Sequence, residues 1–166
     1  EQELGIDSAG FGKIGMFLSL TMALGFWALG RHPWWHFRGR WMWAFHAGLA
    51  CSLLLAYAAS GPLALYLCAG LTGVGISFLY ASHLYYGVTG GARRSRRMAI
   101  HEVLVSAGFL VGAYGGGLLA GVIGLRAPYV VGCGALMCGV VAEMVIHRGN
   151  KAPAAETAKS PTVPTP

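Results

Sequence analysis

Two acidic side chains lie within the long apolar runs of this sequence, and they are its strongest candidates for chemistry inside a membrane. Glu102 follows a cluster of arginines at the start of one apolar run, and Glu143 lies near the end of another. A carboxylate within a membrane is costly unless it is paired, so it suggests a function by default. The structural alternative is that Glu102 caps its helix, where the helix dipole favours an acid, and that Glu143 pairs with Arg148. Both explanations stay open for Glu102, whereas a salt bridge is the preferred explanation for Glu143.

Three histidines also fall within apolar runs, at a similar depth: His46, His83 and His101. Imidazoles placed in this way can serve as axial haem ligands, as a metal site or as a proton relay. None of them has the spacing of a zinc motif. The four cysteines lie in apolar runs too, which favours small buried thiols over a disulfide framework. We therefore expect no metal and no cofactor, with haem kept as the alternative.

The composition points away from a soluble protein. Hydrophobic residues make up 55% of the chain and charged residues only 11%, whereas a soluble domain carries about a quarter charged residues. The motifs of serine hydrolases, zinc proteases, Walker loops and dinucleotide sites are absent, so we expect no enzyme activity. The net charge of +6 does not indicate nucleic acid as a partner, because the arginines flank apolar runs instead of forming one basic face. The expected surroundings are a lipid membrane.

The chain divides into a short polar start, an apolar domain and a polar tail. Residues 1–10 are expected to form an extracytoplasmic segment, residues 11–149 a transmembrane domain, and residues 150–166 a disordered cytoplasmic tail rich in proline, alanine and threonine. About twenty apolar residues span a bilayer as a helix. The sequence thus predicts an all-α integral membrane protein with five transmembrane helices, at approximately residues 11–29, 41–59, 63–86, 98–123 and 129–146.

The distribution of basic residues predicts the orientation. Of the twelve lysines and arginines, all except Lys13 and Arg126 fall on the side that the tail shares with the loops after the first and third helices. Because basic residues concentrate in cytoplasmic loops, we expect the N-terminus outside and the C-terminus in the cytoplasm, in a plasma or inner membrane. Five spans with an outside start would suit a chain whose preceding helix has been removed.

Two stripes at helical spacing complete the pattern. Gly108, Gly112 and Gly116 recur every fourth residue and would form a groove into which another helix packs. On the preceding helix, Ser77 and Tyr80 share one face, which is expected either to line a cavity or to form hydrogen bonds between helices.

These features together resemble a known family. A helix that ends in Tyr85-Tyr86, a loop with clustered arginines, a helix that opens with Glu102 and the run GFLVGAYGGGLLAG resemble the tenth and eleventh helices of major facilitator superfamily transporters. The first helix and the loop GRHPWWHFRGR resemble the eighth helix of that family and the loop that follows it. The family often has Gly-x-x-x-Asp-Arg-x-Gly-Arg in that loop, and only Arg38-Gly39-Arg40 matches it here. The resemblance covers residues 5–149.

The resemblance implies a partial C-terminal bundle of a secondary transporter for a small molecule. The resemblance also places the first, third and fourth helices of this chain beside a central pathway. The residues that it implies as the lining are Tyr80, His83, Glu102 and Tyr114. An acid inside a basic mouth further suggests a cytoplasmic gate, in which Glu102 pairs with arginines, the candidates being Arg38, Arg40 and Arg97. Such a bundle would need further transmembrane helices, from the same or another chain, to be active. The alternative is a small membrane subunit of a larger complex, a class that includes redox complexes and subunits that bind haem through intramembrane histidines.

Overall fold

The computed structural model describes residues 6–36, 38–89 and 94–149 of the chain. In these ranges the chain is helical and contains no strand: α1 (Ser8–Arg31), the short 3-10 helix η1 (Pro33–Trp35), α2 (Gly39–Ala58), α3 (Pro62–Thr89), α4 (Arg94–Val122) and α5 (Ala127–Gly149). Within the described residues, five of these helices are long and apolar enough to cross a membrane. This confirms the predicted all-helical class and indicates an integral membrane protein.

The helices extend beyond the predicted apolar runs. Asp7 caps α1, because its side chain accepts a hydrogen bond of 2.7 Å from the backbone of Gly10. The helix α4 begins at Arg94, four residues earlier than the apolar pattern indicated, since arginine is a good helix former and needs no apolar environment. Residues 1–5, Arg93 and the predicted tail at 150–166 lie outside the described residues.

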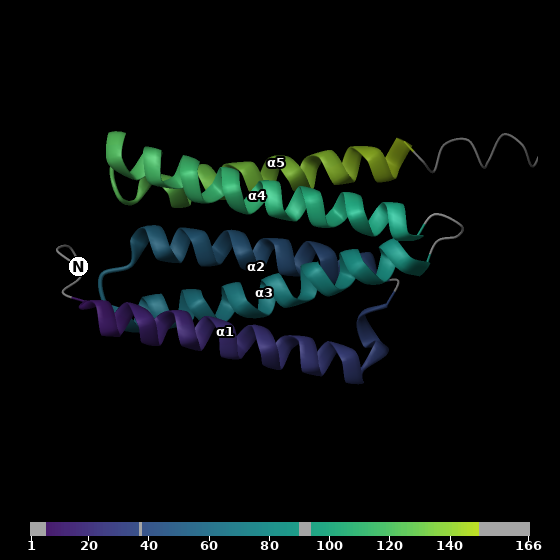
Figure 1. Ribbon diagram of the computed structural model, residues 1–166, viewed down its shortest axis with the longest axis horizontal. Helices are drawn as coiled ribbons and strands as arrows, with labels where there is room; N and C mark the ends of the chain where they lie inside the picture. Colours follow the sequence, from purple (N-terminus) through teal and green to yellow (C-terminus); the bar gives the residue numbers. More distant parts are fainter. Residues whose placement is uncertain (1–5, 37, 90–93, 150–166) are drawn as a thin grey trace, which may run out of the picture.

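Successive helices run in opposite directions along the long axis of the bundle (Figure 1). The end of α1, the start of α2, the end of α3, the start of α4 and the end of α5 therefore lie together, at one end (Figure 1). We call this the basic end, because seven arginines of the described residues belong to these helix ends and their flanks: Arg31, Arg38, Arg40, Arg94, Arg96, Arg97 and Arg148.

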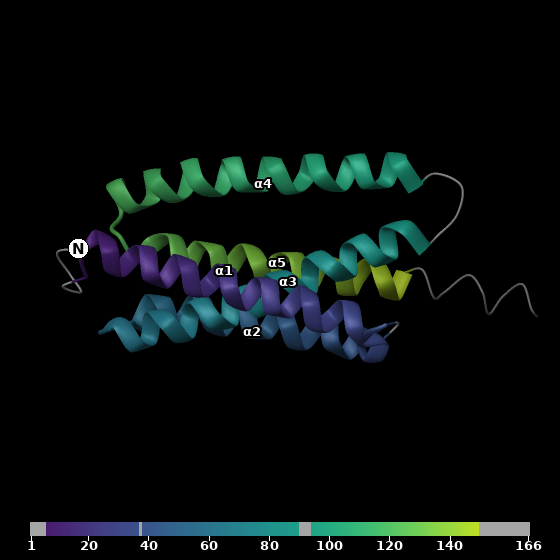
Figure 2. The ribbon, with the colours of Figure 1, turned by 60° about the horizontal axis from the view of Figure 1, so that its bottom comes forward.

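The helix α3 lies at the centre, between α1 and α2, and α5 packs on α2. Four buried side chains, Leu29, Trp35, Met42 and Phe78, form a core near the basic end. By contrast, α4 makes its main contacts with only two helices, α3 and α5. None of its residues is buried. Figure 2 shows it lying apart from the other four helices.

Glycine explains the close approach of α1 to α3. A Cβ atom at Gly73 would lie 2.6 Å from the carbonyl oxygen of Leu18 and 3.0 Å from the backbone nitrogen of Met22. Likewise, a Cβ at Gly25 on α1 would lie 2.9 Å from the Cβ of Ser77 on α3. Small residues let two membrane helices pack backbone to backbone, which gains the dispersion energy that holds them together.

A buried hydrogen-bonded pair joins α2 to α3. The Ser52 hydroxyl donates to the carbonyl oxygen of Cys68 at 3.0 Å, and the same hydroxyl lies 2.6 Å from that of Thr72. These bonds satisfy polar groups that would be costly to bury alone, so they fix how α2 is turned against α3.

Candidate functional site

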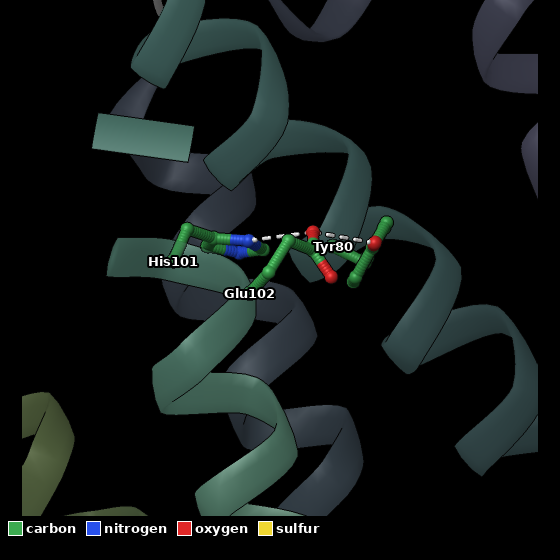
Figure 3. A network of polar contacts seen from close by, with 3 residues as sticks. All are labelled: Tyr80, His101 and Glu102. Atoms are coloured by element: carbon green, nitrogen blue, oxygen red, sulfur yellow. Dashed lines mark hydrogen bonds and ion pairs between the residues drawn. The ribbon is translucent and has the colours of Figure 1, made fainter. Parts of the chain in front are cut away.

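The junction between α3 and α4 contains a cluster of polar side chains (Figure 3). The Tyr80 hydroxyl of α3 donates a hydrogen bond of 2.9 Å to Oε1 of Glu102 on α4. The Nδ1 atom of His101 lies 3.2 Å from the same oxygen. With His83, whose ring centre is 5.8 Å from that of His101, these residues form what we call the α3–α4 cluster. Four of the sequence's candidates for chemistry therefore lie together.

One atom of the cluster is a buried acceptor or donor without a protein partner. The Nε2 atom of His101 is buried and makes no hydrogen bond within the described part of the chain. When Nδ1 carries the ring proton and donates to Glu102, Nε2 is an acceptor. A buried polar atom of this kind requires a partner such as water or a ligand. The arrangement can therefore bind a hydrogen-bond donor between α3 and α4.

The position of Glu102 along α4 rules out the capping explanation. The first turn of α4 holds no acid, and Glu102 lies eight residues after Arg94, which is about 12 Å along the helix axis. The helix dipole acts mainly within the first turn. The contacts that hold the Glu102 carboxylate come instead from Tyr80 and from the neighbouring His101.

The aromatic ring of Tyr80 is positioned from two sides. Phe26 of α1 packs edge-on against it, with the ring centres 5.9 Å apart, and His101 of α4 packs similarly at 5.4 Å. Because α1 and α3 are held together through Gly73, the Tyr80 hydroxyl is presented to α4 by a firmly packed pair of helices.

Tyr114, the remaining pathway candidate, is not part of the cluster. It follows Glu102 by twelve residues on α4, about 18 Å along the axis. Its side chain is 71% exposed and lines a shallow groove of 370 Å³ with Gly117 and Gly121 of the same helix. A pathway that included both Tyr114 and Glu102 would run along somewhat less than half of the 29 residues of α4.

The gate candidates lie at the basic end, in separate helices. Arg38 and Arg40 flank the start of α2, and the Arg40 guanidinium lies over the Trp41 ring, 5.5 Å from its centre. Arg97 belongs to the start of α4, five residues before Glu102. A latch between Glu102 and these arginines stays a prediction.

The glycine stripe of α4 meets almost nothing within the chain. A Cβ atom at Gly108 or Gly112 would have no atom within 4 Å, and one at Gly116 would have Pro128 at 4.0 Å as its nearest neighbour. The helical spacing places these glycines on the same face as His101 and Leu119, which are among the less exposed residues of α4. The stripe is thus turned towards the bundle, yet no side chain of the described residues fills it.

Glu143 stands beside the start of α2. It lines a small cavity of 80 Å³ together with Gly39, Met42 and Trp43. The side chain of Arg148, its expected partner, lies outside the described residues.

One polar contact at the opposite end of the bundle was not predicted from the sequence. The Arg126 guanidinium, in the turn between α4 and α5, donates to the carbonyl oxygens of Tyr57 at 3.0 Å and Ala59 at 3.3 Å. The last carbonyls of a helix lack partners within it. A basic residue in a turn, such as Arg126, is therefore the kind of residue that could have indicated a contact with a helix end. Gly124 makes this turn with a φ of 135°, a conformation that favours glycine.

Among the described residues, no group of three His, Cys, Asp or Glu side chains is placed to hold a metal ion. Comparisons with the models of known protein families, with curated proteins and with solved structures found no match.

Proposed function

We propose that this chain forms one wall of the substrate pathway of a secondary transporter, and that further transmembrane helices complete it. The observation that carries the proposal is the hydrogen bond between Tyr80 and Glu102, which places a carboxylate within a membrane-crossing helix at its junction with α3. Ionisable groups at such positions mark substrate or ion pathways when they face a bundle interior or a water-filled cavity.

The exposure of Glu102 supports a polar pathway beside α4 that further helices complete. Its side chain is 50% exposed, although it lies about one helical turn inside the apolar part of α4, which begins at Met98. A half-exposed carboxylate in contact with lipid would be costly. Water in a pathway, or polar groups on further helices, would remove that cost.

The packing of α4 supports the same proposal. The helix has no buried residue, and its glycine stripe has no occupant among the described residues. Membrane helices gain no hydrophobic energy by associating, so a glycine stripe contributes only when another backbone fills it. Secondary transporters form their sites near the membrane midplane between two repeats, and a bundle with one open helix would suit one side of such a site.

The family and the orientation are part of this proposal. The layout of helices and the Glu102 and glycine motifs support a major facilitator superfamily type of transporter for a small molecule. The arginines at the basic end support a cytoplasmic location for that end, because basic residues are retained on the cytoplasmic side.

Labelling of single cysteines in the intact membrane tests the proposal. In a chain whose four native cysteines are replaced, His83→Cys would report on the α3–α4 cluster. Val141→Cys, on the exposed face of α5, is the control at a similar distance from the basic end. In inverted membrane vesicles, which expose the cytoplasmic side, a membrane-impermeant thiol reagent should label the cysteine at position 83 and leave the one at 141 unreacted.

The reason is that a thiol reacts quickly only as a thiolate in water, and a pathway supplies water where lipid does not. Added substrate should slow the labelling at position 83 once the substrate is known. Equal labelling at both positions, or none at position 83, would contradict a pathway beside the cluster.

A further inference from the structure

A groove at the basic end is lined by parts of α1, η1 and α3 and by no residue of α4 or α5; Figure 1 shows α1 at the edge of the bundle opposite α4 and α5. It has a volume of 360 Å³, and the ends of α1 and α3 line it together with η1. Its lining includes Gly30 of α1, Trp35 and His36 of η1, and Ala81 and Tyr85 of α3. We call it the η1 groove.

The walls of the η1 groove are held in place before any ligand binds. Trp35 is 4% exposed, and its indole Nε1 donates to the carbonyl oxygen of Leu29 at 3.1 Å, which folds η1 back over the end of α1. The ring of Trp35 packs edge-on against Tyr85, with centres 5.3 Å apart, and His36 stacks on Tyr85 at 4.0 Å. A preformed groove loses little entropy when a ligand orders in it.

The lining of the groove suits a hydrocarbon chain with a polar end. Apart from the His36 imidazole and the Tyr85 hydroxyl, the side chains that line it are apolar or aromatic. The groove lies at the end of membrane-crossing helices. An occupant at this level of a membrane has apolar chains on one side and headgroups on the other.

The charge around the groove favours an anionic headgroup. Three exposed arginines flank it in sequence: Arg31 at the end of α1, and Arg38 and Arg40 at the start of α2. The sequence has no acidic residue between Asp7 and Glu102. From the neighbouring helices, Glu143 of α5 approaches the start of α2, so this side of the basic end carries more cations than carboxylates.

We propose that the η1 groove binds an anionic glycerophospholipid from the leaflet at the basic end. Part of one acyl chain lies against Trp35 and Ala81, and the phosphate lies among the flanking arginines. Arginine pairs with phosphate through two parallel hydrogen bonds, and basic residues beside a membrane helix attract anionic lipids. A zwitterionic lipid offers the same chain without a net charge, so it binds this groove more weakly.

The full chain, purified in detergent, tests the site without any transport assay. Phosphatidylglycerol and phosphatidylcholine with identical acyl chains are added in equal amounts, and the retained lipid is counted by native mass spectrometry. Phosphatidylglycerol should be retained in preference. Gly30→Leu should abolish this preference by filling the groove, since a Cβ atom at Gly30 meets no atom within 4 Å and the helix need not move. Gly48→Leu, equally free of close contacts but outside the groove, is the control and should retain the lipid.

A second pair of variants separates the site from general attraction to the basic end. Arg38→Gln should weaken phosphatidylglycerol retention by about fivefold, the effect of one basic residue near the headgroups. Arg94→Gln, on α4 at the same end, should leave it unchanged. The proposal is overturned if the two lipids are retained equally, if Gly30→Leu and Gly48→Leu behave alike, or if Arg94→Gln costs as much as Arg38→Gln.

Discussion

The contact between α1 and α3 gives the sharpest test of the packing, through the substitution Gly73→Ala. The added Cβ would lie 2.6 Å from the Leu18 carbonyl oxygen and 3.0 Å from the Met22 nitrogen, and it would also meet the Thr21 hydroxyl. Two of these neighbours are backbone atoms of a regular helix, which cannot step aside as a flexible side chain can. The helix α1 must therefore move away from α3.

The size of the effect follows from these distances. Ordinary contact begins at 3.4 Å, so the carbonyl oxygen at 2.6 Å requires a displacement of about 0.8 Å. A gap of that size loses a quarter to a half of the dispersion energy of the contacts that open. Overpacking of this kind costs about 1–3 kcal/mol, and the helix preference of alanine over glycine returns about 0.5–1 kcal/mol. We expect a net loss of about 0.5–2 kcal/mol in the free energy of unfolding.

Gly112→Ala is the matched control, because it makes the same change in a long helix without any neighbour within 4 Å. In the isolated chain it should be neutral or stabilise by up to about 1 kcal/mol. Both variants can be compared by reversible unfolding in mixed micelles with a rising fraction of dodecyl sulfate, followed by tryptophan fluorescence. If Gly73→Ala unfolds together with Gly112→Ala, the close approach of α1 to α3 is wrong.

Two further predictions concern the orientation and the α3–α4 cluster. With the native cysteines replaced, a cysteine placed in the tail should react with an impermeant reagent only after the membrane is permeabilised, whereas one placed near Asp7 should react in intact cells; reaction of both from the same side would refute five alternating spans. A double-mutant cycle with Tyr80→Phe and Glu102→Gln should show a coupling free energy of about 0.6 kcal/mol, the average for hydrogen bonds between membrane helices. Additive effects in the unfolding assay would mean that the two side chains do not interact.

The five helices could be predicted from the sequence because each apolar run is long enough to cross a membrane, and hydropathy depends on composition alone. Their ends could not, because arginines continue a helix without adding to its apolar run. The start of α4 at Arg94 is the main example. Because α4 begins at Arg94, Glu102 lies beyond the first turn of the helix. The capping explanation, which the apolar pattern had left open, is therefore excluded.

Contacts between helices could be predicted less well. Glycine spacing shows where a backbone can approach, but it does not show which helix approaches it. Gly108 and Gly112 have the more conspicuous spacing, yet the close contacts occur at Gly25 and Gly73. In the same way, Tyr80 and Glu102 were candidates on separate grounds, and their hydrogen bond depends on how α3 and α4 are rotated, which periodicity does not determine.

The hydrogen bonds of Arg126 hold one end of α4 in place, so a small rotation about that end produces a large displacement at the other. They tie the turn after α4 to the end of α2, while Glu102 lies twenty residues before Val122, the last residue of α4, at a distance of about 30 Å. A rotation of about 5° about that turn would displace Glu102 by about 2.6 Å, which approaches the 2.9 Å length of its bond with Tyr80. A rotation of α4 that leaves its Arg126 end in place is therefore enough to separate Tyr80 from Glu102. The α3–α4 cluster is sensitive to a change in the angle of α4 even when the other helices do not move.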